Sequence, residues 1–221
     1  MVHIEKGLEP KELLDAKRKG LTDYDSMDTP TKKAVKAQLY REQYQLCAYC
    51  MRRLDEKTMQ IEHYIAQNPE DGSYDAAQTI NFRNMLGVCP GGKHEVHAFK
   101  DMTCDQHRKN IPLTVDPLDV NSVALVRYRS DGEIYSDDPD IDKDLCETLN
   151  LNGTASRLKR SRKEALDALK KWIHKEYGKK NIPASEWQRI LTKYCTPQNG
   201  AKKEYVGIIE WYLKKKIRAA R

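Results

Sequence analysis

Four cysteines are the residues of this chain whose types and spacing most directly suggest chemistry. Cys47 and Cys50 form a Cys-x-x-Cys pair, and Cys89 and Cys104 follow at longer intervals. A Cys-x-x-Cys turn can place two thiolates on one tetrahedral zinc ion, and two thiolates from a distant segment then close a structural site. The spacing therefore predicts one structural zinc ion held by these four side chains.

The same cysteines could instead form a redox pair, be buried core thiols or share the zinc ion with a histidine. A redox pair is disfavoured because no βαβ pattern surrounds the Cys-x-x-Cys pair, and two buried core thiols would not require this spacing. His94 and His97 lie between the third and fourth cysteines, and either could replace a cysteine as a zinc ligand.

A carboxylate and a histidine stand side by side after the first cysteine pair. Residues 58–66, TMQIEHYIA, alternate like a β-strand, with Glu62 on one face and His63 on the other. A histidine on such a face usually belongs to the core. Here Asn84 follows shortly before the third cysteine, and imidazole titrates near neutrality, so we expect His63 to be a general base that deprotonates an attacking water.

The motifs CAYC, IEHY, NMLGVC and CDQHRKN, in this order, resemble the HNH (ββα-metal, His-Me finger) endonuclease superfamily. The opening HIEKGLEPKELL, the run REQYQLCAYC and the later DP, DG and LNLN segment are similar to the PtuB-like family. This family comprises the HNH nuclease subunits of Septu-type antiphage defence systems, some of which accompany retrons. The similarity covers the chain to about Arg162.

The resemblance implies roles for individual residues. His63 matches the general base, and Asn84 matches the asparagine that braces the loop and orients that base. Asp105, His107 and Glu62 are candidate ligands of a catalytic Mg²⁺ or Mn²⁺ ion. On a helix Asp105 and His107 point about 200° apart, so we expect only one of them to bind the ion. Strand neighbours face opposite sides, so Glu62 could take part only at a bulge or strand end.

The resemblance also implies an activity and partners. The activity is hydrolysis of phosphodiester bonds in DNA or RNA, which the sequence does not distinguish because the two share their phosphate chemistry. The partners are a PtuA-like ATPase and, in some members, a retron reverse transcriptase with its msDNA. The alternative is a zinc-stapled nucleic-acid-binding or scaffold module with a degenerate active site, for which the four cysteines would serve equally well.

The chain has 221 residues, of which 39% are hydrophobic and 33% are charged, and it contains no long apolar run. These values predict a soluble cytoplasmic protein with no membrane span or signal peptide. Six cysteines without a secretory signal favour metal binding over disulfides. Cys146 and Cys195 lie outside the cluster and are expected to be ordinary buried thiols.

Positive charge is concentrated in the basic C-terminal region, residues 157–221. This region has 19 Lys and Arg residues against 6 Asp and Glu residues, whereas the whole chain has a net charge of only +6. Such a region can bind nucleic acid, dock an acidic partner or simply be a solvated helix surface. We expect it to be a docking region that is dispensable for the chemistry.

The elements around the motifs predict an α+β protein with a small zinc-stapled ββα-metal core at residues 47–115. A helical lead-in at 1–46 contains a short helix near 10–16 and a helix from Thr29, as N-cap, through Gln45. Asn-Pro and Asp-Gly dipeptides predict loops rather than regular structure at 68–83. An acidic connecting segment at 116–156 contains a β-hairpin at 122–136 around Asp131 and Gly132.

Three amphipathic helices are predicted in the basic C-terminal region. Ser185 is expected to cap the second helix, and Trp211 is expected to lie exposed beside the third apolar stripe. The stripes comprise Leu158, Ala165, Leu166, Leu169, Trp172, Ile173 and Tyr177; Trp187, Ile190, Leu191, Tyr194 and Cys195; and Tyr205, Ile208, Ile209, Tyr212, Leu213 and Ile217.

Overall fold

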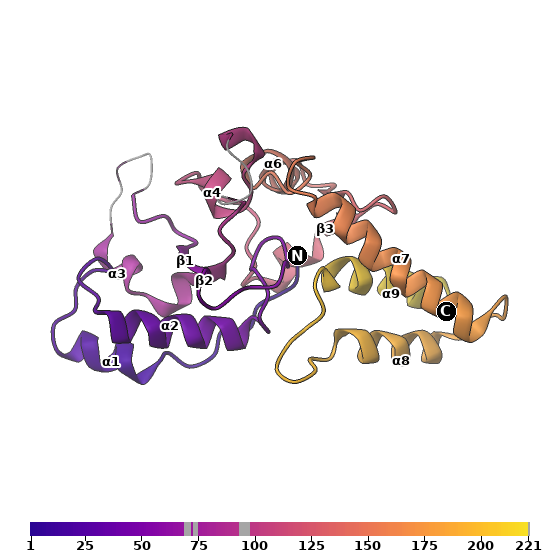
Figure 1. Ribbon diagram of the computed structural model, residues 1–221, viewed down its shortest axis with the longest axis horizontal. Helices are drawn as coiled ribbons and strands as arrows, with labels where there is room; N and C mark the ends of the chain where they lie inside the picture. The colour runs from indigo at the N-terminus through magenta and orange to yellow at the C-terminus, as the bar shows by residue number, and fades with distance from the viewer. Residues whose placement is uncertain (69–71, 73–74, 93–97, 221) are drawn as a thin grey trace.

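A computed structural model of the chain describes residues 1–68, 72, 75–92 and 98–220, and these form a mixed α+β structure (Figure 1). The elements of the first half are α1 (Lys11–Arg18), α2 (Thr29–Glu42), β1 (Gln60–His63), α3 (Ala76–Thr79), η1 (Phe82–Asn84), β2 (Met85–Val88), η2 (Phe99–Asp101) and α4 (Asp105–Arg108). Those of the second half are α5 (Val120–Ala124), β3 (Val126–Tyr128), β4 (Ile134–Ser136), α6 (Pro139–Lys143), the π-helix η3 (Asp144–Thr148), α7 (Leu158–Tyr177), α8 (Ala184–Cys195) and α9 (Val206–Ala219).

Strands β1 and β2 form an antiparallel pair in which His63 lies opposite Met85 and Glu62 opposite Leu86. All four residues of β2 are buried. The strand β2 ends directly before Cys89, and helix α4 begins directly after Cys104. Cys89 therefore directly follows the second strand, and Cys104 directly precedes the short helix.

Helix α2 packs against β2 and is fastened to it by Gln43, which follows the helix. The side-chain amide of this buried residue donates to the carbonyl oxygens of Leu46 and Gly87 at 2.9 and 2.7 Å, and its oxygen accepts from Gly87 N at 2.6 Å. A Cβ at position 87 would lie 2.8 Å from Met59 Cε and 3.3 Å from the Gln43 amide, so a larger residue there would have to displace these side chains. Helix α2 therefore holds the strand that leads to Cys89.

The start of α2 differs from the prediction by one residue. Asp28, not Thr29, is the N-cap, and its carboxylate accepts from Thr31 N at 2.8 Å. Both residue types can cap a helix, and in the structure Asp28 takes this position while Thr29 is the first helical residue. The segment predicted as loop also contains α3 and η1, each begun by a side chain, Asp75 and Asn81 respectively, that accepts a backbone N–H.

The predicted β-hairpin is present as β3 and β4, with Tyr128 opposite Ile134. Its first predicted residues, 122–124, are instead helical and belong to α5. The turn is held by Arg162, a fully buried residue of α7 whose Nε donates to Gly132 O at 2.6 Å. The same guanidinium donates to Asn152 Oδ1 at 2.8 Å and so fixes the hairpin to the chain before α7.

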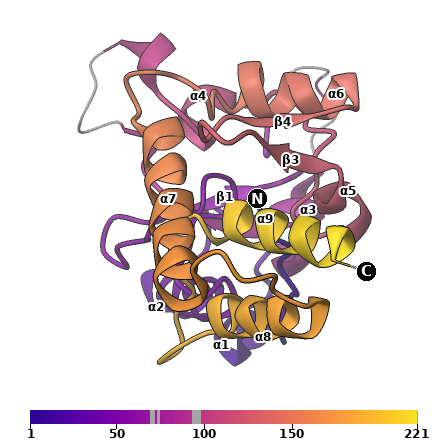
Figure 2. The same ribbon diagram turned by 90° about the vertical axis from the view of Figure 1, so that its right-hand side faces the viewer.

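Helices α7, α8 and α9 occupy one side of the molecule, and Figure 2 shows α8 lying beside α9 while α7 crosses them. The apolar stripes predicted for these helices face the core. Two details were wrong. Pro183, not Ser185, precedes α8, and no side chain caps that helix. Trp211 is half-buried because its ring packs edge-on against Tyr128, with centroids 6.2 Å apart.

The basic C-terminal region packs against the cysteine loop, residues 47–53. Tyr205 N donates to Met51 O at 3.1 Å, and Gly207 N lies 3.2 Å from Met51 Sδ. Arg53 N donates to Glu204 Oε1 at 2.8 Å. The basic C-terminal region, predicted to begin at residue 157, therefore contacts the predicted core of residues 47–115 directly. In the described part of the chain, no helix has both the length and the apolar character needed to cross a bilayer.

Candidate metal centre and active site

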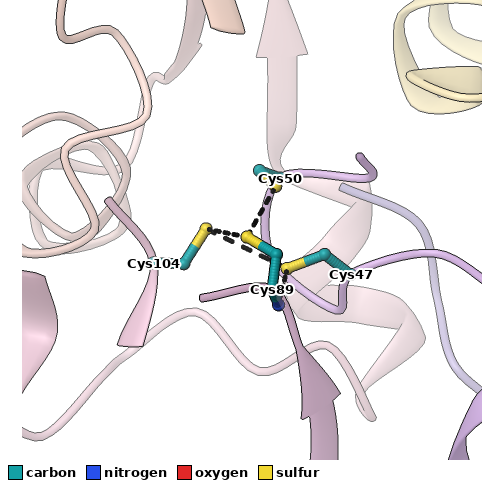
Figure 3. A group of neighbouring side chains, drawn as sticks. All are labelled: Cys47, Cys50, Cys89 and Cys104. Atoms are coloured by element: carbon teal, nitrogen blue, oxygen red, sulfur yellow. Dashed lines mark hydrogen bonds between the residues drawn. The ribbon is translucent and has the colours of Figure 1, made fainter. Parts of the chain in front are cut away.

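The four predicted cysteines converge on one point, as Figure 3 shows. All are buried, and their sulfur atoms lie within 4.8 Å of one another. The Sγ–Sγ distances are 3.9 Å from Cys47 to Cys104, 3.7 Å from Cys50 to Cys89 and 3.8 Å from Cys89 to Cys104. These distances are too long for disulfides, whose sulfur atoms lie about 2.05 Å apart.

The same distances fit a tetrahedral metal site. Four thiolates at about 2.3 Å from a central zinc ion would be separated by about 3.8 Å along each edge of the tetrahedron. The cluster could therefore hold a metal ion such as zinc. Among the residues that the structure describes, no other group of three or more His, Cys, Asp or Glu side chains is placed to share an ion.

Backbone geometry brings the cysteines together from separate elements. Cys47 and Cys50 stand in the turn after α2, where Met51 N donates to Cys47 O at 3.0 Å and Met51 itself has a φ of 62°. Cys89 follows β2, and its N–H donates to Cys47 Sγ at 3.4 Å. Cys104 is the N-cap of α4.

The electrostatics of the cluster favour one thiolate. Burial raises the pKa of the Cys47 thiol, but hydrogen bonds from the other three thiols lower it, and its pKa lies well below the ordinary value. His94 and His97, the alternative ligands, lie outside the described residues. Cys146 and Cys195 are half-buried outside the cluster, and burial raises the pKa of each.

His63 is the last residue of β1 and is only 5% exposed. Its Nε2 lies 2.8 Å from Thr79 O, and Tyr24 contacts the ring edge-on with centroids 5.0 Å apart. A carbonyl oxygen can only accept, so Nε2 carries the hydrogen and Nδ1 keeps a lone pair. Burial lowers the pKa of His63, although Thr79 and Asp105 oppose this shift. The geometry and the pKa both favour an unprotonated Nδ1.

Asn84 links the end of β1 to the segment between the strands. Its Oδ1 accepts from Ile65 N at 2.7 Å, and its Nδ2 donates to Ile65 O and Gln78 O at 3.0 Å each. Gln78 lies one residue before Thr79, whose carbonyl holds His63. Asn84 therefore braces the backbone on both sides of the histidine.

Glu62 is also buried, although it lies on the opposite face of β1 from His63. Its Oε1 accepts from Tyr49 OH at 3.2 Å and forms an ion pair with Arg108. Burial raises the pKa of Glu62 well above its ordinary value, and the neighbouring carboxylate of Asp105 raises it further, against Arg108 and Tyr49.

Asp105 and His107 diverge on α4, as the helical period predicts. Asp105 approaches Glu62, whereas His107 Nδ1 lies 3.0 Å from Thr148 O and its ring stacks on Phe99 with centroids 4.8 Å apart. The structure therefore brings together Glu62 and Asp105, near His63, and directs His107 elsewhere.

Three residues at this site were not identified from the sequence: Arg108, Tyr49 and Tyr24. Arg108 lies three residues after Asp105, and this spacing puts both on one face of α4. That spacing is the signal that could have identified it. Tyr49 lies between the two cysteines of the Cys-x-x-Cys pair, and that motif indicates a role only for the cysteines. Tyr24 lies in a loop that shows no hydrophobic periodicity or motif.

Comparisons with known proteins add no assignment, since no family model matches the chain and a search of curated proteins found no match.

Proposed function

We propose that the chain is a zinc-stapled, metal-dependent HNH endonuclease that hydrolyses phosphodiester bonds of nucleic acid. The observation that carries the proposal is His63, whose Nε2 is engaged by Thr79 O so that Nδ1 is available to take a proton from water. The bracing bonds of Asn84 support it, as does the succession of β1, β2 and α4 around four cysteines. The motif resemblance supplies the reaction class.

The ion at the four cysteines is zinc in this proposal, and its role is structural. Tetrathiolate sites with no open position are typical of structural zinc rather than catalytic zinc. The site joins the turn after α2, the end of β2 and the start of α4. It would therefore fix the strands relative to the helix.

Glu62 and Asp105 are the side chains that best fit a catalytic Mg²⁺ or Mn²⁺ ion. Carboxylate oxygens are the ligands these ions prefer. Burial and the neighbouring Asp105 carboxylate raise the pKa of Glu62, and a cation between the two carboxylates would oppose this shift. Arg108 and Tyr49 both donate to Oε1, which leaves Oε2 for an ion. Such an ion would stabilise charge on the scissile phosphate. His107, held by Thr148 O, is the weaker candidate.

The biological role follows the sequence resemblance alone. We propose that the nuclease is the effector subunit of an antiphage defence system. Its partner would be a PtuA-like ATPase, accompanied in retron-containing systems by a reverse transcriptase and msDNA. Co-purification of the two tagged subunits tests this role separately from the chemistry.

The test of the activity compares three variants on plasmid DNA, single-stranded DNA and RNA with Mg²⁺ or Mn²⁺. His63→Ala should cut about 10²–10⁴-fold more slowly than the parent, as removal of a general base commonly does. Asp105→Asn should lose activity and shift its metal requirement, and His107→Ala should cut nearly normally. Zinc content and circular dichroism should be unchanged in all three. Equal cleavage by His63→Ala and the parent would refute the assignment and favour a binding module.

A further inference from the structure

A groove runs across the C-terminal helices. It consists of two adjoining depressions of about 420 Å³ each. One lies between α7, α9 and the start of α8, and the other lies between α7, α9 and the β3–β4 hairpin. They share Lys170, Tyr212, Lys216 and Ala219. The groove follows the crossing of α7 and α9 that Figure 2 shows.

The groove is lined by cations and not by carboxylates. Lys170, Lys180, Lys215, Lys216 and Arg129 contribute to its walls, and no Asp or Glu is among the described residues that line it. Within the described chain, the four lysines form no ion pair.

Three lysines of the basic C-terminal region that lie outside the groove are compensated by carboxylates, although others in the described chain, such as Lys171 and Lys175, are not. Lys159, Lys163 and Lys214 are each paired with a carboxylate, at 2.8 Å from Asp131 in the case of Lys159. Arg129 of the groove is also paired, at 3.0 Å from Glu133, but Lys170, Lys180, Lys215 and Lys216 have no carboxylate partner among the described residues, and their charge favours an anionic occupant.

Aromatic rings alternate with the lysines. The ammonium groups of Lys170 and Lys216 each lie 5.6 Å from the ring centroid of Tyr212. Lys216 also lies 6.0 Å from the ring of Trp187, and Lys215 lies 5.6 Å from that of Trp211. Ammonium groups beside aromatic rings suit a chain that repeats a phosphate and a base, because bases stack on rings and phosphates pair with cations.

We propose that this groove binds single-stranded nucleic acid, with phosphates at Lys170 and Lys216 and a base against Tyr212. An acidic peptide would match the charge but would gain little from the rings. The groove and the His63 site lie on different elements, in the two halves of the molecule seen in Figure 1. Binding at the groove therefore requires no cleavage at His63, and the proposal goes beyond the proposed nuclease function.

Binding of fluorescein-labelled 20-nucleotide oligo(dT) and oligo(U), without added Mg²⁺ or Mn²⁺, tests the proposal. Lys170→Glu combined with Lys216→Glu should weaken binding at least about tenfold and reduce the salt dependence by about 0.7 per lost phosphate contact. The matched control is Lys171→Glu with Lys175→Glu, which makes the same charge change on exposed α7 positions outside the groove. Equal affinities of the two double variants would overturn the proposal.

A second comparison separates a nucleic acid from an acidic protein. Tyr212→Leu keeps the charge and most of the packing, so it should weaken binding of oligo(dT) but not of a polyglutamate peptide with the same number of charges. Polyglutamate that binds as tightly as oligo(dT), or an unaltered affinity for oligo(dT), would overturn the proposal. Cleavage is measured separately. Oligonucleotide binding at the groove by a protein that cleaves no nucleic acid would refute the proposed nuclease function but not the proposed binding groove.

Discussion

Arg108 joins strand and helix at the proposed active site through one fully buried guanidinium. Besides its ion pair with Glu62, it donates to the backbone carbonyls of His63 and Tyr64, at 3.3 and 2.6 Å. It also donates to Ile111 O at 2.8 Å. These bonds fix the Glu62 carboxylate and the backbone at His63 and Tyr64 to α4. Arg108 is thus a positioning residue.

Replacement of Arg108 should cost more than replacement of a surface arginine. Arg108→Gln leaves the buried Glu62 without its cation, and breaking one half of a buried pair costs about 3–5 kcal/mol. The control, Arg160→Gln, breaks an exposed pair with Glu164 and should cost under about 1 kcal/mol. Urea unfolding measures both. Adding Glu62→Gln to Arg108→Gln should restore part of the loss, and an unaffected single variant would contradict the network.

The activity of the parent should depend on the ionisation of His63. Its unprotonated form is the active one, and burial lowers its pKa, so the rate should rise with pH through an ionisation below the ordinary histidine value of about 6.5. Activity should therefore persist into mildly acidic solution. Single-turnover cleavage between pH 5 and 8 measures this. A rate that begins to rise only above pH 7 would contradict the arrangement.

The sequence could predict residues whose types and spacing are characteristic, but not residues whose roles arise only from contacts in the folded chain. The four cysteines were predictable because metal ligands have characteristic spacings, and all four converge. Tyr49 and Tyr24 were not predictable because their roles arise from contacts across 13 residues in one case and from a loop laid against β1 in the other. The divergence of Asp105 from His107 followed from the helical period.

At the scale of elements, the strands of the site are short and depend on their neighbours. Strand β2 has α2 on one side and β1 on the other, and Gln43 supplies three hydrogen bonds that secure α2. Strong local signals predicted the β3–β4 hairpin and the three C-terminal helices. The segment before Asn84 was predicted as loop because α3 and η1 are single turns, too short to show a period.

Removing the side chain of Gln43 should loosen β2. Gln43→Ala leaves the N–H of Gly87 buried without its partner, which costs about 1–3 kcal/mol. Lys33→Ala, at an exposed position of α2, should have little effect on stability. Amide hydrogen exchange at β2 measures the difference, and protection of Gly87 that is equal in both variants would argue against this role.

At the scale of the whole molecule, the four-cysteine cluster and the C-terminal helices stabilise the same loop from two sides. The cluster fixes Cys47 and Cys50, and α9 holds Met51 through Tyr205 and Gly207. We therefore expect removal of the basic C-terminal region to disturb the loop. Whether the basic C-terminal region is dispensable for the chemistry is therefore better tested by reversing its charges than by removing it.

Cys89→Ser should lose zinc and fold poorly, because the binding energy of a structural zinc ion, about 10 kcal/mol or more, is coupled to folding. Elemental analysis of the parent should give one zinc ion per chain. Cys146→Ser, outside the cluster, should keep zinc and its thermal transition. A parent protein that is folded but free of zinc would rule out the structural role.

The contacts between the cysteine loop and residues 204–207 join parts of the chain that are synthesised at different times. The partners Arg53 and Glu204 are separated by 151 residues, and Met51 and Gly207 by 156. At about 5–20 residues per second, a ribosome needs on the order of ten seconds to make that intervening chain. The loop emerges early and lacks its cover throughout that interval. The contacts of the cysteine loop with Glu204 and Gly207 can therefore form only after both of these residues have left the ribosome.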